Sequence, residues 1–338
     1  MRVSIFGASG YTGGELLRIL VNHKGIELSF LTSREHAGKP VHLVHPHLKG
    51  LLKSKFSSVS EAMRGDCDLA FLSLPPGNSK DLTPTLLEMG IKVVDLSPDF
   101  RLRDPELYGR WYGWVHPFPD LLRRSVYGIP EFNRDEIKLS SLVAVPGCNA
   151  TSTLLASAPL ASLGADCLIA DLKVGSSEAG SKPSKGSHHP ERSQAIRPYS
   201  PSGHRHQAEV EQELRKFNPR IKVSIVPHSV GAVRGSFASV HALIDVDEGT
   251  LWREFAKLYS NEPFIRIMPR GVFPDVKNVI GSNFADLGFS IDEKFGRATG
   301  FAAIDNLGKG AAGQAVQCMN LMLGFRETEA LLIPPLRP

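Results

Sequence analysis

Cys148 carries the clearest chemical signal in the sequence. It follows Pro146-Gly147 and immediately precedes residues 149–163, whose apolar pattern predicts a helix. A cysteine at the start of a helix meets the positive end of the helix dipole, which favours the thiolate. The thiolate is the form that attacks an acyl carbon, and a Pro-Gly turn exposes the side chain as a nucleophile elbow does. We therefore expect Cys148 to be a nucleophile.

The other three cysteines have the pattern of buried structural thiols. Cys67, Cys167 and Cys318 stand in apolar strand or helix patterns, where free cysteine is usually inert. The four cysteines contain no CxxC pair, so neither a zinc ribbon nor a disulfide framework is predicted. Reduced thiols indicate a cytoplasmic protein.

A general base for the thiol is expected in the segment of residues 202–207. His204 and His206 stand there, just before a predicted helix, and a histidine at a helix start tends to be neutral, as a base must be. His204 and His206 could also bind a metal, but no third ligand stands at suitable spacing. The three histidines between residues 42 and 47 have the pattern of a polar loop. No metal site is predicted.

A glycine-rich turn at the N-terminus predicts a dinucleotide site. The segment Gly7–Gly13 has the spacing GxxGxxG between a predicted strand at residues 3–6 and a predicted helix. Such glycines let the backbone approach a pyrophosphate, which also meets the free N–H groups of the helix. The expected contacts are Gly7, Ser9, Gly10, Tyr11, Thr12 and Gly13.

The end of the second predicted strand favours NADP over NAD. An acidic residue at this place would bind the ribose 2′-hydroxyl of NAD, whereas Ser33 and Arg34 offer a hydroxyl and a guanidinium, which suit a 2′-phosphate. Glu35 follows directly and could instead take the NAD role.

Two kinds of domain are predicted around these residues. Strand-like and helical stretches alternate over the first 145 residues, which is typical of βαβ units and a parallel sheet. After Pro146 come a helix and then strands at 166–174, 222–226 and 237–246, which resemble an antiparallel sheet. The fold class is therefore α/β: an N-terminal Rossmann domain followed by an α+β catalytic domain with a mixed or antiparallel sheet.

Residues 175–206 form a long polar stretch that we interpret as a functional loop. From residue 182 on it carries one acid, Glu191, and five bases: Lys182, Lys185, Arg192, Arg197 and Arg205. A solvated charge run is the alternative reading.

Composition excludes several classes of protein. The chain has 338 residues, enough for about two domains, with 42% hydrophobic and 22% charged residues, as in ordinary globular proteins. The net charge of +4 is too small to predict nucleic-acid binding. No stretch is long and apolar enough for a signal peptide or a membrane span.

Six blocks along the chain resemble the N-acetyl-γ-glutamyl-phosphate reductase superfamily. They lie between residues 3 and 324 and read VSIFGASGYTGGELLRIL, DLSPDFRL, YGIPEFNR, PGCNAT, GHRHQAEVEQEL and DNLGKGAAGQAVQCMNLM. Two departures resemble the branch whose substrate is attached to the amino-group carrier protein LysW. The usual PGCYPT reads PGCNAT, with Asn149 after the cysteine, and the SGAGR-like motif at residues 177–181 lacks its arginine.

The resemblance implies roles for individual residues. It favours His206 over His204 as the acid/base and places Asn306 near the nicotinamide. The expected substrate-binding residues are Asn149, Ser177, Gly180 and Arg205. The terminal segment, residues 308–338, should return to the first domain, residues 1–146, and residues 147–307 should form the catalytic domain.

The resemblance also implies a reaction, namely NADPH-dependent reduction of a LysW-linked aminoadipyl or glutamyl phosphate to the semialdehyde through a thioester on Cys148. This reaction belongs to lysine or arginine biosynthesis, and a homo-oligomer (dimer or tetramer) is expected. Three alternatives remain open: reduction of free N-acetylglutamyl phosphate, an aspartate-semialdehyde-type dehydrogenase, and a redox sensor that binds NADP without turnover.

Overall fold

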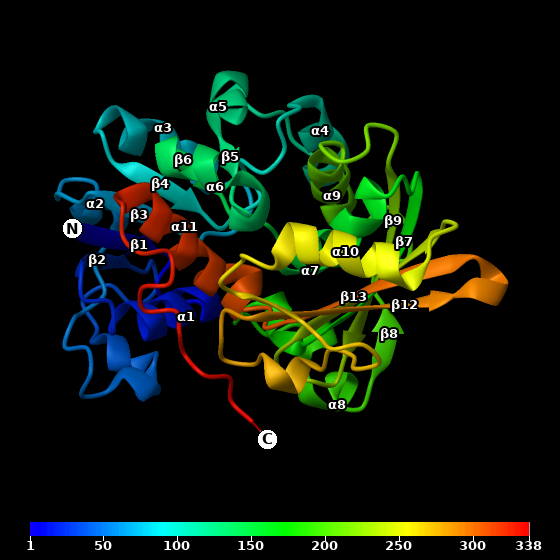
Figure 1. The fold of residues 1–338 in the computed structure, drawn as a ribbon. Coiled ribbons are helices and arrows are strands. Elements are labelled where there is room, and N and C mark those ends of the chain that lie inside the picture. The colour runs from blue at the N-terminus through cyan, green and yellow to red at the C-terminus, as the bar shows by residue number, and fades with distance from the viewer. Residues whose placement is uncertain (338) are drawn as a thin grey trace. The chain divides into compact units, whose positions relative to one another are not determined.

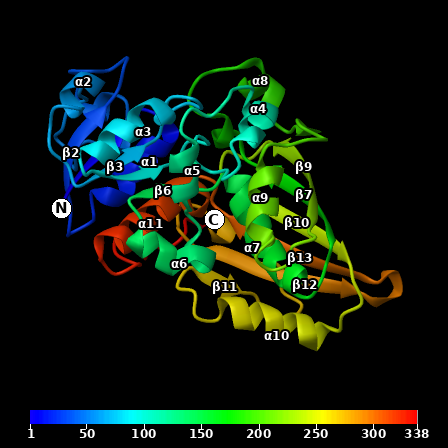
Figure 2. The same cartoon turned by 90° about the horizontal axis from the view of Figure 1, so that it is seen from above.

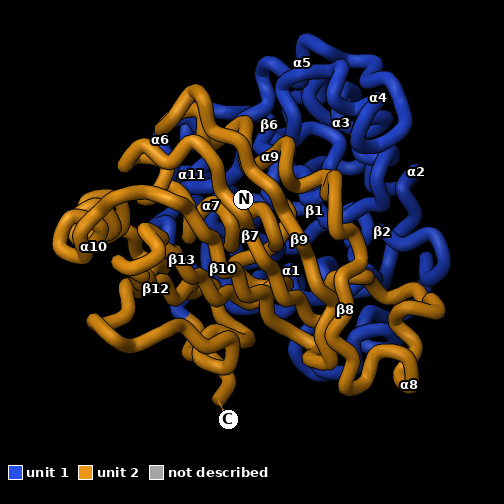
Figure 3. Tube along the Cα trace, turned by 90° about the vertical axis from the view of Figure 1, so that its right-hand side faces the viewer, with its two compact units in different colours: residues 1–146, 311–332 blue, residues 147–310, 333–338 orange. Residues whose placement is uncertain are grey.

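The computed structural model describes residues 1–337, which form two compact units (Figures 1 and 3). The first, blue in Figure 3, contains residues 1–146 and 311–332, and the second contains residues 147–310 and the chain from 333 onward. Residues 308–310 and the chain after 332 thus differ from the expected division, since they belong to the second unit. The tail is held there because the Leu336 N–H donates to the Ile280 carbonyl at 2.7 Å.

The first unit is built on a six-stranded parallel sheet. The order across it is β2 (Glu27–Thr32), β1 (Arg2–Phe6), β3 (Leu69–Leu72), β4 (Lys92–Asp95), β6 (Leu142–Ala144) and β5 (Val126–Tyr127). The chain passes from β1 to β2 on one side and then returns to β3 on the other side of β1. The strand order therefore reverses between β1 and β3, and doubly wound sheets bind ligands at such a switch point. The predicted Rossmann fold is confirmed.

Helices complete the first unit. Most of them cross over between consecutive strands, while α11 packs against α1, α6 and β4 although it lies at the far end of the sequence. Their bounds are α1 (Tyr11–Leu20), α2 (Val59–Ala62), α3 (Ser79–Glu88), α4 (Glu106–Tyr112), α5 (Pro119–Arg124), α6 (Pro130–Leu139) and α11 (Gly313–Leu323).

The second unit is built on a seven-stranded mixed sheet. Its order is β11 (Ile265–Ile267), β12 (Ala285–Asp292), β13 (Arg297–Ile304), β10 (Ser236–Leu243), β7 (Cys167–Val174), β9 (Lys222–Val230) and β8 (Ile196–Pro198). The β7–β9 and β11–β12 pairs are parallel and the others antiparallel. The helices of this unit are α7 (Cys148–Ser162), α8 (His189–Arg192), α9 (His206–Leu214) and α10 (Glu248–Tyr259).

Helix α7 is the central element of the second unit. It packs on β10 and β13 and is flanked by α9 and α10 (Figures 1 and 2). Residues 149–161 are all buried, and because most of them are Ala, Ser, Thr or Leu, the helix can be covered on every side. Gly300 of β13 permits the close approach, since a Cβ there would lie 2.0 Å from the Ala156 carbonyl oxygen.

Candidate active site

Cys148 is the first residue of α7, as the sequence predicts. The chain turns into the helix at Gly147, an extended N-cap residue that offers no capping side chain. The first N–H groups of this 15-residue helix therefore have no capping side chain, and the half-buried Cys148 stands at this end. This environment favours the thiolate and offers donors to an anion bound beside it.

The His206 imidazole lies against the backbone on one side of Cys148. His206 is the first residue of α9 and is buried, and a Cβ built on Gly147 would lie 2.3 Å from its Nε2 atom. The ring therefore packs on the peptide immediately before the cysteine. The structure brings together these two residues, which are 58 positions apart in the sequence.

His204 supports His206. Its ring lies 4.7 Å from the His206 ring at an interplanar angle of 84°, and its Nδ1 atom accepts the His206 N–H at 3.3 Å. Burial and then the charge of Arg205 lower the pKa of His204 to about 4, so it is neutral near pH 7 and can act as this acceptor. The geometry therefore favours His206 as the acid/base and gives His204 a positioning part.

Glu209 was not singled out from the sequence. Its carboxylate is fully buried and accepts the Gly147 N–H at 3.2 Å through Oε2, while Oε1 lies 3.8 Å from His206 Nε2. One acid thus fixes both the turn before the nucleophile and the imidazole. The available signal was its spacing, because residues three apart share a helix face.

Asn149 fixes the other side of Cys148. Its Oδ1 accepts a hydrogen bond from Ser236 at 3.2 Å, and its Nδ2 donates to the Tyr199 hydroxyl at 3.0 Å. Asn149 is buried, whereas Tyr199 exposes 40% of its surface. The sequence had pointed to Asn149 but not to Tyr199, because nothing in the loop pattern singles out this tyrosine.

Ser177 and Asn306 are joined by a buried hydrogen bond. Asn306 Nδ2 donates to Ser177 Oγ at 2.8 Å, and its Oδ1 accepts the Gly235 N–H at 2.8 Å. Ser177 belongs to the short helical turn Ser176–Ala179, which ends at the exposed Gly180. The structure thus brings together Ser177, Gly180 and Asn306, three of the expected site residues. Asn306 was expected near the nicotinamide, and its hydrogen bonds here hold Ser177.

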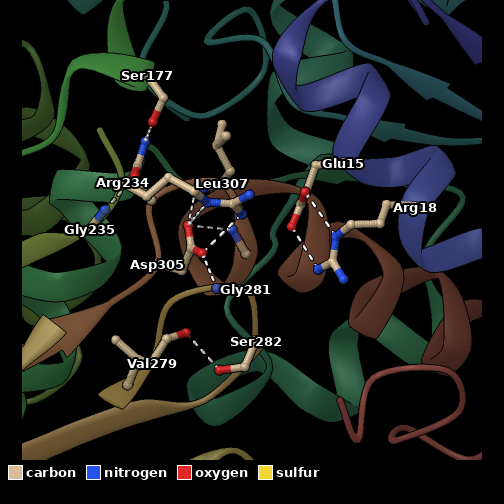
Figure 4. A network of polar contacts seen from close by, with 12 residues as sticks. Glu15, Arg18, Ser177, Arg234, Gly235, Val279, Gly281, Ser282, Asp305 and Leu307 are labelled. Atoms are coloured by element: carbon tan, nitrogen blue, oxygen red, sulfur yellow. Dashed lines mark hydrogen bonds and ion pairs between the residues drawn. The ribbon is translucent and has the colours of Figure 1, made fainter. Parts of the chain in front are cut away.

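Asp305 anchors the segment that carries Asn306. This fully buried carboxylate pairs with Arg234 at 2.9 Å and accepts the backbone N–H groups of Gly281, Leu307 and Gly308 (Figure 4). It therefore ties three loops of the second unit together next to the Ser177–Asn306 pair. Its neutralising partner and three donors explain how a buried charge is tolerated here.

In the first unit, the glycine-rich turn connects β1 to α1 at the switch point. Gly7 has φ +86°, and a Cβ there would lie 2.2 Å from the Ser73 carbonyl oxygen, so only glycine fits. Gly10 is the N-cap of α1 without a capping side chain, and Tyr11 and Thr12 open the helix. The geometry fits a pyrophosphate on the free N–H groups of the first turn.

Two contacts hold this turn in place. Ser33 Oγ donates to Ser9 Oγ at 2.9 Å, and the ring of His45, which the sequence left in a polar loop, reaches the Ala8 carbonyl at 2.8 Å through Nε2. Arg34 is exposed and donates to Asn78 at 3.3 Å, and Glu35 is exposed beside it. The charged side chains at the end of β2 therefore face solvent, where a ribose phosphate can reach them.

The basic residues of the long polar stretch, residues 175–206, differ in how far they are exposed to solvent. Lys182, Lys185 and Arg205 are exposed, whereas Arg192 is buried and donates to the Val230 and Val174 carbonyls at 2.9 and 3.0 Å. Arg192 therefore holds the loop to the ends of β9 and β7. The sequence had suggested that Arg192 belongs to a surface charge patch, and this is wrong because the side chain is buried.

Within residues 1–337, no group of three or more His, Cys, Asp or Glu side chains is arranged to hold a metal ion. Among the same residues, no helix has the length and hydropathy needed to cross a membrane.

Comparisons with known proteins agree with the predicted family. Residues 2–140 match the family model described as semialdehyde dehydrogenase, NAD binding domain, and residues 148–306 match semialdehyde dehydrogenase, dimerisation domain. The LysW-L-2-aminoadipate/LysW-L-glutamate phosphate reductases of Sulfurisphaera tokodaii and Sulfolobus acidocaldarius are 55% and 53% identical to this chain. Each alignment covers 100% of this chain and 99% of the relative.

A solved structure shares the fold. Aspartate semialdehyde dehydrogenase II from Vibrio cholerae superposes with a TM-score of 0.74 at 18% identity, over 96% of this chain and 98% of that one. At this identity the likeness concerns the architecture alone.

Proposed function

The chain belongs to the semialdehyde dehydrogenase family, and from this premise we propose that it reduces a LysW-linked acyl phosphate to the semialdehyde. The acyl group is that of 2-aminoadipate, glutamate or both, so the reaction serves lysine or arginine biosynthesis. Support comes from the relatives at 53–55% identity that are named for this reaction and cover the whole chain. The observation that carries the chemistry is Cys148 at the start of α7 with His206 against the preceding peptide.

In the first step, the Cys148 thiol gives its proton to His206 and the sulfur attacks the acyl carbon. The carbon–oxygen bond to phosphate breaks, and His206 returns the proton to the departing phosphate oxygen. A thioester on Cys148 remains, which accepts hydride more readily than a carboxylate does. The Glu209 Oε1 atom lies 3.8 Å from His206 Nε2 and the Oε2 atom accepts the Gly147 N–H, so this side chain holds the imidazole beside the turn that carries Cys148.

In the second step, the thioester carbon on Cys148 accepts a hydride, which a nicotinamide cofactor would supply when bound at the glycine-rich turn of residues 7–13. The carbonyl oxygen then carries a negative charge, which backbone N–H groups at Asn149 and beyond can stabilise. Collapse of this tetrahedral species breaks the carbon–sulfur bond, releases the aldehyde and returns the Cys148 thiolate. One proton from solvent restores the thiol.

We propose NADPH as the reductant. Arg34 is exposed at the end of β2 and suits a 2′-phosphate, and Ser33 lies next to it. Arg34→Ala should weaken NADPH binding and leave NADH binding unchanged, whereas Arg64→Ala, which removes another cation of the same unit, should change neither. An unchanged preference in Arg34→Ala would assign the 2′-phosphate to other residues.

We further propose a homo-oligomer built through the second unit, whose family model is described as a dimerisation domain. The helices α7 and α9 pack on one face of its sheet. On the other face, Ile169 and Leu243 expose 56% and 72% of their surfaces, which suits a second copy of the chain. Light scattering on the purified protein tests this. None of the four cysteines takes part in a disulfide, and we propose a cytoplasmic location.

The test of the proposed substrate compares turnover of a LysW-linked acyl phosphate with that of free N-acetylglutamyl phosphate under the same conditions. We expect the carrier-linked substrate to have the higher kcat/KM. A preference for the acetylated substrate would assign the chain to the free-substrate reductases.

A further inference from the structure

Tyr199 is held at the side of the nucleophile by three contacts. Its hydroxyl oxygen accepts a hydrogen bond from Asn149 Nδ2 at 3.0 Å, and its backbone N–H donates to the Pro227 carbonyl at 3.2 Å. Its ring packs edge-on against His204 at 5.8 Å. The phenol thus links the long loop to both β9 and the first turn of α7, with its hydroxyl next to the residue that follows Cys148.

The direction of the hydrogen bond at Asn149 leaves the phenolic hydrogen for another partner. Ser236 donates to Asn149 Oδ1 at 3.2 Å, so the amide nitrogen faces Tyr199 and must be the donor in that contact. The tyrosine oxygen is therefore an acceptor towards Asn149. Its own O–H can then donate a hydrogen bond to a ligand.

Tyr199 is both protonated and reachable. Burial around the hydroxyl, followed by the negative charges of Glu178 and of the Cys148 thiolate, raises the pKa of Tyr199, so the phenol keeps its proton at neutral pH. The hydroxyl is bonded to Asn149, the residue that directly follows Cys148 in the chain. The residue as a whole exposes 40% of its surface, so part of the ring borders the solvent from which a substrate arrives.

We propose that the Tyr199 hydroxyl donates a hydrogen bond to the acyl oxygen of the substrate at Cys148. This inference rests on the proposed acyl chemistry. When the sulfur–carbon bond forms, the carbonyl π electrons move onto that oxygen, and the donor stabilises the negative charge until the bond to phosphate breaks. The same oxygen becomes negative again when hydride adds to the thioester. Donors aimed at a developing charge act mainly on the transition state.

Tyr199→Phe tests the proposal because it removes only the hydroxyl. Acylation is followed with acetyl phosphate as the probe, by phosphate release and by the mass of the intact protein. Losing one donor of this kind costs about 10²–10³ in rate. We expect a loss of that order in the maximal acylation rate of Cys148, with little change in the acetyl phosphate concentration that gives half of it. NADPH affinity should be unchanged.

Tyr259→Phe is the matched control. This tyrosine belongs to the same unit, and its hydroxyl donates to the Leu155 carbonyl of α7 at 2.8 Å, far along the helix from Cys148. We expect Tyr259→Phe to lower the stability of the unit while acylation stays at the wild-type rate. A general loosening of α7 would instead slow both variants alike.

Wild-type acylation in Tyr199→Phe would overturn the proposal and leave the reductase function intact. Acylation that depends on Tyr199, together with no turnover of the LysW-linked substrate, would overturn the carrier assignment alone. If no acyl phosphate acylates Cys148 in the wild-type protein, both the acyl chemistry and the part of Tyr199 are wrong.

Discussion

Two histidines that are neighbours in sequence have unlike environments in the site. His206 packs on the peptide before Cys148 and faces the buried Glu209 carboxylate, whereas His204 lies behind it and accepts its N–H. A base that must take up a proton benefits from a nearby carboxylate. Burial and, after it, the charge of Arg205 lower the pKa of His204.

The two histidines should therefore respond differently to substitution. His206→Asn should lower kcat by about 10²–10⁴, the usual effect of losing one general acid–base group. His204→Asn should have a clearly smaller effect, because the asparagine oxygen can still accept the His206 N–H. Steady-state rates with saturating NADPH measure both, and the reverse order would make His204 the acid/base.

Protonation of His204 should also appear in the pH dependence of stability. Its pKa is about 4 in the folded state and near 6.5 in the unfolded chain, so between these values the unfolded chain binds the extra proton. The free energy of unfolding should therefore rise with pH across this window, with a contribution from His204 on the order of 3 kcal/mol, and level off above it. Urea unfolding of wild type and His204→Asn measures this contribution as the pH-dependent part of their difference. A pH-independent difference would contradict it.

The positions of Cys148 and His206, the proposed catalytic pair, were predictable because each residue has a local signature. Cys148 follows Pro-Gly at a helix start, and His206 begins an amphipathic segment. Glu209 has only its three-residue spacing from His206, and its contact with Gly147 depends on the tertiary structure. Tyr199 has no local signature, since only the tertiary structure brings it near Asn149. His45 was missed for the same reason, because its partner is a backbone carbonyl of a distant turn.

Helix α7 carries the proposed nucleophile at its first residue, so the packing of this helix on β10 and β13 determines the position of Cys148. The helix approaches β13 so closely that Gly300 faces the Ala156 carbonyl, and a methyl group there would lie 2.0 Å from the oxygen. Backbone at this distance cannot move aside independently of the helix, so the position of α7 depends on this glycine.

Gly300→Ala should therefore destabilise the protein by about 1–3 kcal/mol, the usual range for overpacking a core. Chemical denaturation measures the change. Gly109→Ala is the matched control, because it lies inside α4 with open space at its Cβ position, and alanine there should be neutral or slightly stabilising. Equal stability of wild type and Gly300→Ala would show that α7 is not fixed by this contact.

The sequence predicted some helices and strands and missed others. The buried parallel strands and α7 are continuous apolar runs that stand out in the sequence. The strands β11, β12 and β13 were missed, because their residues include Gly288 and Gly300 and many polar positions that only cross-strand pairing organises. The polar loop contains the short β8, which exists because it pairs with β9.

For the molecule as a whole, the charges that can meet an acidic carrier are those exposed on the long loop. Lys182 and Lys185 are exposed, while Arg192 is used inside the unit. Electrostatic steering between protein surfaces weakens as the Debye length falls from about 30 Å at 0.01 M salt to about 8 Å at 0.15 M. Activity on LysW-linked substrate should therefore decline with salt, and activity on a small acyl phosphate should hardly respond.

Charge reversal tests the same idea at constant salt. Lys182→Glu with Lys185→Glu should raise KM for the carrier-linked substrate and spare kcat, because these residues act on the approach of the partner. Lys277→Glu with Lys294→Glu, which reverses two other exposed lysines of the unit, serves as the control. Equal KM values for both double variants would remove the loop from carrier recognition.

If the substrate is held as a thioester on Cys148, the acylated protein can be trapped before hydride transfer. The enzyme is mixed with LysW-linked acyl phosphate without NADPH, and the phosphate released and the mass of the intact protein are recorded. We expect about one phosphate per site and one acyl group on Cys148, in wild type and in Cys167→Ala. Cys148→Ala should show neither, while it binds NADPH normally. Phosphate release, or even a few per cent of turnover, in Cys148→Ala would show that Cys148 is not the nucleophile.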